Sequence, residues 1–260
     1  MNDGPRVARV RHEIKRRRLT VARVERLPPK MVRIVLGGEE LRGFTSLGFD
    51  DHIKVFFPGS PAVATDGAVR PEMRDFTPRL FDAEKGELWI DFFLHEGGPA
   101  ATWAAQATVG QTLQIGGPKG SAVIAQEGID AHVLIGDETA LPAISRRLEE
   151  LPVASRTFVV IEIDVDSDRS VLASRAVLDV VCVRRDGRSG PPAHEIIDAL
   201  RKLQFPPDRS FAWVAGESRA ARAIRGYLRD ERGLDKKWIK AAGYWQRGSA
   251  GEHDKIPDED

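Results

Sequence analysis

The chain has 260 residues, of which 42% are apolar and 30% are charged, and its 39 Lys and Arg side chains balance 39 Asp and Glu side chains. This length gives room for one large domain or two moderate ones, each with a buried core. A formal net charge of zero provides no overall field that would attract nucleic acid or a membrane surface.

The sequence contains no apolar run long enough to span a bilayer and no apolar core of a signal peptide. We therefore expect a cytoplasmic protein without stable membrane association. Cys182 is the one cysteine, which excludes an internal disulfide, a cysteine-based zinc site and an iron–sulfur cluster. No His, Cys and carboxylate cluster has metal-ligand spacing, so we expect no protein metal site, and redox chemistry would need an organic cofactor.

The two ends of the chain carry opposite charges. Residues 1–18 hold seven Lys or Arg against two carboxylates, and residues 251–260 hold five carboxylates against one Lys. We expect residues 1–16 and 249–260 to be flexible arms. An RNA-binding arm is the alternative, but no aromatic residue is interleaved with Arg16-Arg17-Arg18, and we expect no nucleic-acid partner.

Short apolar segments, separated by turn residues, recur between residues 17 and 127. They are Leu19–Val24, Met31–Leu36, His52–Phe57, Leu88–Leu94 and Thr112–Ile115. Several short strands at close spacing predict a small antiparallel β-barrel. Residues 99–107 interrupt it as a helix, with Pro99 at the first helical position.

From residue 128 to 248 the period changes, and apolar strands alternate mostly with helical patterns. The strands are His132–Ile135, Thr157–Ile163, Val177–Val183, Phe211–Ala215 and Ile239–Ala242, and the helices are Leu141–Leu151, Ala193–Leu203 and Ser218–Arg232. This alternation predicts a doubly wound, mostly parallel sheet in a second, α/β domain. We place the joint between the domains at residues 126–130.

Two turns at the expected carboxyl ends of these strands combine a Gly with a hydroxyl near a helix start. They are Gly136-Asp137-Glu138-Thr139-Ala140 and Gly216-Glu217-Ser218. Each alone fits ordinary helix capping, and neither is the G-x-G-x-x-G fingerprint of a dinucleotide site. As a pair behind a flavin-type barrel they indicate nicotinamide binding.

The segment Arg74-Asp75-Phe76-Thr77-Pro78-Arg79 carries the clearest ligand pattern. On an extended segment the cation suits a phosphate, the aromatic suits a flat ring, and the hydroxyl suits a ring nitrogen. A Gly-rich turn at residues 97–98 then enters the helix at Pro99 and offers backbone N–H groups to further phosphate charge. A flavin dinucleotide meets all of these requirements.

The chain, with its predicted barrel, flavin motif and α/β half, resembles the ferredoxin-reductase superfamily. Within that superfamily it is most similar to the siderophore-interacting proteins, which are flavin-dependent ferric-siderophore reductases. The resemblance covers roughly residues 17–248. It rests on Asp51-His52-Ile-Lys54, Arg74-x-Phe76-Thr77-x-Arg79, Asp91-Phe-x-Leu-His95, Gly98-Pro99-Ala100-x-x-Trp103-Ala104, Gly117-Pro118-Lys119-Gly120-Ser121, residues 136–143, Ala215-Gly216-Glu217-Ser218 and Gly243-Tyr244-Trp245-x-x-Gly248.

The resemblance implies FAD held between the two domains, with Thr77 near the reactive flavin nitrogen as the one catalytic residue. The residues implied to bind FAD are Arg74, Phe76, Thr77, Pro78, Arg79, Asp91, Phe93, His95, Gly98, Ala100, Ala101 and Thr102. The chain departs from the family at Phe76, where Tyr is common, and at Ala101, where a Ser often serves the phosphate. Thr102 or backbone N–H groups would replace that Ser.

The resemblance also implies that the turns at Gly136–Ala140 and Gly216–Ser218 receive a reduced nicotinamide. Arg184, Arg185 and Arg188 follow a strand and favour NADPH over NADH as the donor. Trp245 is a candidate to cover the flavin ring, with a packing aromatic as the alternative. Lys54 and Arg247 are candidates to bind an anionic chelate, and Lys240 and Lys255 are not placed.

The implied reaction transfers hydride from NAD(P)H to FAD and then single electrons to the Fe(III) of a ferric siderophore, which releases Fe(II). A reductase with a quinone, free flavin or an electron-carrier protein as its acceptor is a second interpretation. A non-catalytic binder of flavin or ferric chelate is a third. We expect the protein to be a monomer.

Overall fold

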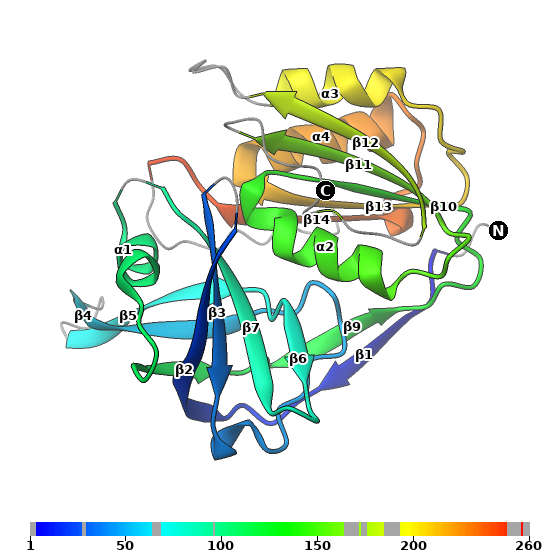
Figure 1. Cartoon of the computed structure of the whole chain (residues 1–260). Helices are drawn as coiled ribbons and strands as arrows, with labels where there is room; N and C mark the ends of the chain where they lie inside the picture. The colour runs from blue at the N-terminus through cyan, green and yellow to red at the C-terminus, as the bar shows by residue number, and fades with distance from the viewer. Residues whose placement is uncertain are drawn as a thin grey trace. The chain divides into compact units, whose positions relative to one another are not determined.

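The computed structural model describes residues 4–27, 30–63, 69–95, 97–163, 172, 176–184, 193–248 and 256 (Figure 1). The chain divides into two compact units. One comprises residues 7–123, and the other comprises residues 124–260 together with residues 1–6. The first is built on antiparallel strands and the second on parallel strands, as the change of period in the sequence predicts.

The antiparallel unit contains a seven-stranded sheet with the order β5-β4-β8-β2-β3-β7-β6, and a separate ribbon of β1 and β9. Its strands are β1 (Val7–Arg11), β2 (Arg16–Leu27), β3 (Met31–Gly37), β4 (Ile53–Val63), β5 (Val69–Phe76), β6 (Leu80–Asp82), β7 (Glu87–Phe93), β8 (Thr112–Gly116) and β9 (Gly120–Ile124), with helix α1 (Pro99–Gln106) between β7 and β8. The predicted barrel strands are therefore present, arranged as a sheet around one apolar core.

Alternation in β2 shows why these residues form half-buried strands. Arg17, Leu19 and Val21 are buried, while the residues between them are exposed. Leu19 and Val21 join a core that also takes in residues of β3, β4, β7 and β8. Apolar residues at every second position place one face of the sheet on this core.

Two parts of the expected arms are ordered. Residues 7–11, within the expected arm at residues 1–16, form β1, which pairs with β9. Every side chain of β1 is exposed, so no burial pattern in the sequence could reveal it. Ile256, within the expected arm at residues 249–260, is 8% exposed and belongs to the core of the α/β unit. The other residues of that arm lie outside the described residues.

The α/β unit has a five-stranded, fully parallel sheet with the order β12-β11-β10-β13-β14. The strands are β10 (Ala131–Gly136), β11 (Arg156–Ile163), β12 (Val177–Arg184), β13 (Ser210–Glu217) and β14 (Ile239–Trp245), and the helices are α2 (Leu141–Glu150), α3 (Ala193–Lys202) and α4 (Ser218–Asp230). The strands that follow β10 in the chain, β11 and β12, lie on one side of it in the sheet, and β13 and β14 lie on the other side. The order of strands therefore reverses between β10 and β13.

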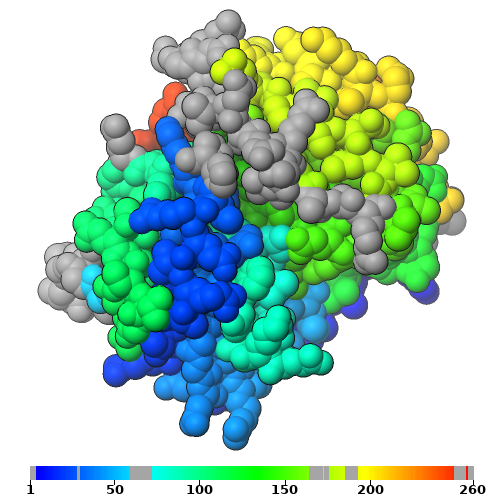
Figure 2. Space-filling model, viewed as in Figure 1, coloured from blue at the N-terminus to red at the C-terminus, as the bar shows by residue number. Residues whose placement is uncertain are grey.

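Helices α3 and α4 pack against the sheet with their apolar faces. In α4 the buried side chains include Ala220, Ile224, Tyr227 and Leu228, at the helical spacing of three or four residues. Helix α3 buries Ile196 and Leu200, and its outer side lies on the surface, in yellow in Figure 2. Among the described residues, no helix is long and apolar enough to cross a membrane.

Candidate functional site

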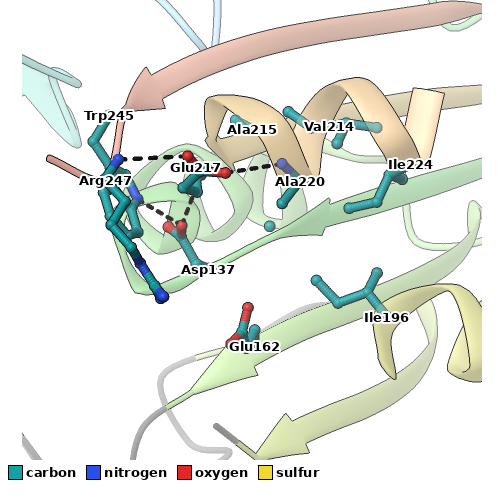
Figure 3. Close-up of a pocket in the computed structure, with 13 residues that line it drawn as sticks. Asp137, Glu162, Ile196, Val214, Ala215, Glu217, Ala220, Ile224, Trp245 and Arg247 are labelled. Atoms are coloured by element: carbon teal, nitrogen blue, oxygen red, sulfur yellow. Dashed lines mark hydrogen bonds between the residues drawn. The ribbon is translucent and has the colours of Figure 1, made fainter. Parts of the chain in front are cut away.

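The strand-order reversal of the α/β unit brings the two predicted turns together. Gly136 at the end of β10 is paired with Ala215 of β13, so the turns that follow these strands lie side by side. In an open parallel sheet ligands bind at the carboxyl ends of the strands, where the order reverses. A small pocket, partly open to solvent, lies there (Figure 3). It is lined by Gly136, Asp137, Glu162, Ile196, Val214, Ala215, Gly216, Glu217, Ala220, Ala221, Ile224, Trp245 and Arg247.

The first turn is shaped by Gly136 and capped by Asp137. A Cβ at Gly136 would lie 2.4 Å from Ala140 Cβ and 2.6 Å from the Ala215 carbonyl oxygen, so the two segments can approach only at a glycine. Asp137 Oδ1 accepts from Thr139 N at 2.9 Å and from the Thr139 hydroxyl. This caps the short 3₁₀ helix Glu138–Ala140, which leads into α2.

The second turn has the same construction. Gly216 has a φ of 150°, and a Cβ there would lie 2.6 Å from Asp137 Oδ2. Glu217 Oε2 accepts from Arg219 N at 2.8 Å and from Ala220 N at 2.9 Å, which caps α4. Because Glu217 occupies these N–H groups, they are not open to an anionic ligand.

Trp245, the last residue of β14, and Arg247, two residues beyond it, complete the pocket. Trp245 Nε1 donates to Asp137 Oδ2 at 2.7 Å, and the same oxygen accepts from Glu217 N at 3.1 Å. Arg247 N donates to Glu217 Oε1 at 3.4 Å, and Ser218 Oγ donates to the Trp245 carbonyl at 3.1 Å. Figure 3 shows the bonds from Trp245 and Arg247 to the Asp137 and Glu217 side chains, beside the bond from Ala220 N to Glu217.

The structure thus gathers most of the residues predicted for the nicotinamide in one place. Gly136, Asp137, Gly216 and Glu217 line the pocket, together with Trp245, which we had considered as a cover for the flavin ring. Glu138, Ala140 and Ser218 are buried in the same turns, and Thr139 is half-buried. Arg247, which we had predicted for the chelate, is the one cation among the described residues that line this pocket.

Sequence reasoning missed Glu162, a buried side chain near the end of β11 that also lines the pocket. A single acid within the apolar run at residues 158–163 was the available signal. Of the cations considered for NADPH, Arg184 ends β12 and is exposed. Arg185 and Arg188 lie outside the described residues, as does Lys255.

In the antiparallel unit the predicted flavin segment begins at the end of β5. Arg74 Nη1 donates to the Met73 carbonyl at 2.8 Å, and its Nη2 pairs with Glu72 on the same strand. Thr77, Pro78 and Arg79 follow the strand and are buried. The Arg74 side chain is 23% exposed, which leaves its guanidinium accessible to a phosphate.

Phe76 belongs to an aromatic cluster. Its ring centroid lies 4.4 Å from that of Phe92 and 6.2 Å from that of Phe57, and Trp103 of α1 lies 5.8 Å from Phe92. Phe76 is half-buried, so part of the side chain remains exposed. Trp103 packs against the core of the unit, as its place in a helix predicts.

Asp91 lies in a buried ion pair. Arg33 donates to both of its oxygens, at 2.7 and 2.8 Å, and Arg79 Nε lies 4.0 Å from Oδ2. The side chains of Asp91 and Arg79 are 4% and 7% exposed. This arrangement ties β3 and β7 to the segment that follows β5, while Phe93 ends β7 and is half-buried.

The start of α1 is open. Gly97 and Gly98 have φ of 77° and 86°, and no side chain caps the helix. A Cβ at Gly98 would lie 3.2 Å from His95 Cε1, so the imidazole rests against the glycine turn. His95 and Thr102 are exposed, Ala100 is half-buried and Ala101 is buried. An uncapped helix start beside two left-handed glycines fits a phosphate of a dinucleotide.

Lys54 lies directly across from Asp75 in the pairing of β4 and β5. Its Nζ is 2.5 Å from Asp75 Oδ2, and its side chain is 37% exposed. The ammonium group is therefore at the surface and is paired with a buried carboxylate.

A Ser, a His and an Asp also meet in this unit, but not in the order of a nucleophilic triad. Ser121 Oγ donates to Asp51 Oδ2 at 2.5 Å and lies 2.7 Å from His12 Nε2. The serine proton is directed at the carboxylate rather than at the imidazole, so His12 is not placed to remove it. Within the described part of the chain, no group of three or more His, Cys, Asp or Glu could hold a metal ion.

Known proteins agree with this architecture. Residues 20–122 match a family model described as the siderophore-interacting FAD-binding domain, and residues 129–248 match one described as siderophore-interacting protein. A crystal structure of a siderophore utilization protein from T. fusca is 34% identical, with a TM-score of 0.84, and covers 95% of this chain and 98% of that one. A ferredoxin reductase of carbazole 1,9a-dioxygenase shares the fold at 16% identity, with a TM-score of 0.66 over 87% of this chain and 68% of that one.

Two relatives with assigned activities extend over almost the whole chain. The NADPH-dependent ferric-chelate reductase of Escherichia coli (strain K12) is 38% identical over 261 residues, which cover 94% of this chain and 99% of that protein. The ferric vibriobactin reductase of Vibrio cholerae is 33% identical over 246 residues, covering 89% of this chain and 90% of that protein. The chain belongs to the siderophore-interacting protein family.

Proposed function

We propose that the protein is an FAD-containing reductase that takes electrons from NADPH and delivers them to ferric siderophores. The observation that carries this proposal is the pocket formed by the Gly136 and Gly216 turns, in a chain whose other half matches the family's FAD-binding domain. The relatives named as ferric-chelate and ferric vibriobactin reductases support the acceptor, and the first of them supports NADPH as the donor.

The antiparallel unit would hold the FAD. Arg74 and the N–H groups at the start of α1 would bind its phosphates, Phe76 would contact a flat ring, and the Thr77 hydroxyl would donate to a ring nitrogen. Pro78, Phe93, His95, Gly98 and Thr102 would line the same site, while Arg79 and Asp91 would support it through their ion pair. Bound FAD would supply the redox chemistry, accepting a hydride and releasing single electrons.

The α/β unit would bind the nicotinamide nucleotide. The glycine turns bring β10 and β13 close together at the pocket, Trp245 supplies an aromatic wall, and Arg247 supplies a positive charge for the nucleotide phosphates. NADH remains the alternative donor. Reduction would take place in the cytoplasm, where reduced nicotinamides are formed, and we propose that a single copy of the chain suffices.

Lys54 is our candidate for the ferric chelate. Its ammonium group is at the surface of the FAD-binding unit and would attract an anionic siderophore. Lys54→Gln should raise KM for an anionic chelate several-fold and leave KM for a neutral chelate unchanged. Lys85→Gln is the matched control, since Lys85 also pairs with a carboxylate, Asp82, and is 69% exposed. Equal effects on both chelates would contradict this role.

The test of the whole proposal is an anaerobic visible spectrum of the FAD-loaded protein. Addition of NADPH should bleach the flavin bands, and a ferric catecholate or hydroxamate should then restore them while Fe(II) appears in a trap. Bleaching that no ferric chelate reverses would move the acceptor to a quinone, free flavin or a carrier protein. Absence of bleaching with NADPH and NADH would leave a non-catalytic binder.

A further inference from the structure

The chain segment at residues 245–247 forms one side of the pocket, and three hydrogen bonds hold it there. The Trp245 indole donates to Asp137, Ser218 Oγ donates to the Trp245 carbonyl, and Arg247 N donates to Glu217. The indole bond, at 2.7 Å, is the shortest of the three and ends on a carboxylate that is 4% exposed. The fixed position of this segment therefore depends on Asp137.

Asp137 is itself held from several directions. One oxygen accepts from the backbone and the hydroxyl of Thr139, and the other accepts from Glu217 N and Trp245 Nε1. Gly216 leaves room for this carboxylate, because a Cβ there would lie 2.6 Å from Oδ2. An indole has a single N–H donor, so a bond to a buried, fully bonded carboxylate sets the orientation of its ring.

We propose that Asp137 is a positioning residue for nicotinamide recognition. Its carboxylate fixes the Trp245 ring as a wall of the pocket and thereby sets the place of Arg247, two residues further on. A nicotinamide nucleotide combines a flat ring with phosphates, so a fixed aromatic wall beside the exposed Arg247 side chain offers it both kinds of contact. The inference rests on the proposed function, because it takes a nicotinamide nucleotide as the ligand of this pocket.

Two substitutions remove the same bond from opposite sides. In Asp137→Asn the amide oxygen replaces only one of the two carboxylate oxygens. The amide NH₂ takes the place of the other oxygen and faces N–H or O–H donors. Trp245→Phe keeps an aromatic wall but removes the donor. Each should raise the Kd of NADP⁺ for the oxidised, FAD-loaded protein about tenfold, or about 1.4 kcal/mol. The double variant should bind no more weakly than the weaker single variant, because both changes break one interaction.

Trp89→Phe is the matched control. Trp89 also donates its indole N–H to a carboxylate, Glu87 Oε2 at 3.2 Å, but it lies in the antiparallel unit. Its substitution should leave the Kd of NADP⁺ within twofold.

Amide and indole NMR supplies a readout that does not depend on turnover. The chain has five tryptophans, and the Trp245 indole signal is the one that Trp245→Phe removes. In Asp137→Asn this signal should shift and its hydrogen exchange should become at least tenfold faster, while the other four indole signals keep their positions. These changes would tie the loss of affinity to the indole bond rather than to general damage.

Different results would refute the proposed function and the positioning role of Asp137. Wild-type protein that binds neither NADP⁺ nor NAD⁺ would refute the proposed function and, with it, the ligand assumed here. Normal wild-type binding, together with a Kd within twofold of it in both variants and an unchanged Trp245 exchange rate in Asp137→Asn, would overturn the positioning role alone. Multiplicative effects of the two substitutions in the double variant would also overturn it.

Discussion

The pocket of the α/β unit and the FAD segments of the antiparallel unit are organised by contacts of different range. In the pocket, Asp137 bonds to Trp245, 108 residues away, and to Glu217, 80 residues away. In the FAD segments, Arg74 pairs with Glu72 two residues away, and Lys54 pairs with Asp75 on the neighbouring strand. One region is closed by long-range bonds to the Asp137 carboxylate, whereas Arg74 and Lys54 of the other pair with carboxylates on the same or the neighbouring strand.

The difference bears on how each region would accept its ligand. The buried Asp137 and Glu217 carboxylates of the pocket each accept several hydrogen bonds, so its shape exists before a nucleotide arrives, which lowers the cost of ordering on binding. The FAD segments carry partly exposed cations whose partners are carboxylates of the chain. A phosphate would have to compete with those carboxylates. We expect substitutions in the two regions to have different signatures.

The largest loss of stability should come from Asp91→Ala. This substitution tests whether the Asp91 ion pair stabilises the fold or acts on the cofactor. Removing this carboxylate leaves the half-buried Arg33 without its bidentate partner and the buried Arg79 without its nearby charge, and should destabilise the protein by about 3 kcal/mol. Urea unfolding of FAD-free and FAD-loaded protein measures this. Glu87→Ala, on the same strand, should change stability far less, because water screens its pair with Arg23. A loss confined to the FAD-loaded form would show that Asp91 acts on the cofactor.

Gly136→Ala should destabilise the α/β unit by about 3 kcal/mol. The added methyl would meet Ala140 Cβ and the Ala215 carbonyl at contact distances that folded proteins do not tolerate, so β10 and β13 would have to separate. Gly226→Ala in α4 is the control of opposite sign. The nearest atom to an added Cβ there is Asp230 Oδ2 at 4.0 Å, an ordinary contact, and the change should stabilise the helix by about 0.5–1 kcal/mol. Unfolding curves in which both variants match the wild type would contradict the tight approach at Gly136.

These contrasts also explain how much the sequence could predict. Strand and helix positions with clear alternation, such as β2 and α4, follow from periodicity, and the parallel order places the Gly136 and Gly216 turns together. The bond between Asp137 and Trp245 does not follow, because it depends on which strand lies beside β13. Strand β1 escaped prediction because all of its side chains are exposed.

The FAD segments show the reverse situation. The pattern Arg74-x-Phe76-Thr77 is local, so the sequence alone indicates a ligand there. What the sequence does not show is that Glu72 neutralises Arg74 and that Arg33 saturates Asp91. A motif identifies the side chains of a site, while the partners that tune their charge emerge only from the strand pairing.

His132 is a buried polar residue near the start of β10, at the end of the sheet opposite the pocket, and it should make stability depend on pH. Burial, with Arg147 nearby, lowers the pKa of His132 from 6.5 to about 3. The unfolded chain therefore binds a proton that the folded chain does not, and stability should fall by up to about 1.4 kcal/mol per pH unit as the pH drops from 6.5 toward 3. His132→Gln should flatten this part of the curve.

Carboxylates titrate at the lower end of this pH range in the wild type and in His132→Gln alike. Only the difference between the two curves of stability against pH therefore belongs to His132. His194→Gln, at an exposed position of α3, should keep the wild-type slope. If His132→Gln and His194→Gln gave parallel curves of stability against pH, the acid sensitivity would not reside in His132.

The smallest effect, and the one that separates the two regions most directly, concerns Arg74. Arg74→Ala should raise the Kd of FAD about tenfold, since a charge-assisted bond to phosphate would be lost. Glu72→Gln should lower that Kd about two- to fivefold, because the guanidinium would no longer be paired with a carboxylate of its own strand. Titration of FAD-free protein with FAD, followed by flavin fluorescence, measures both. Weaker FAD binding by Glu72→Gln would mean that the ion pair orients Arg74 for the phosphate instead of competing with it. Glu72 would then be a positioning residue in the FAD-binding unit, as Asp137 is proposed to be in the α/β unit.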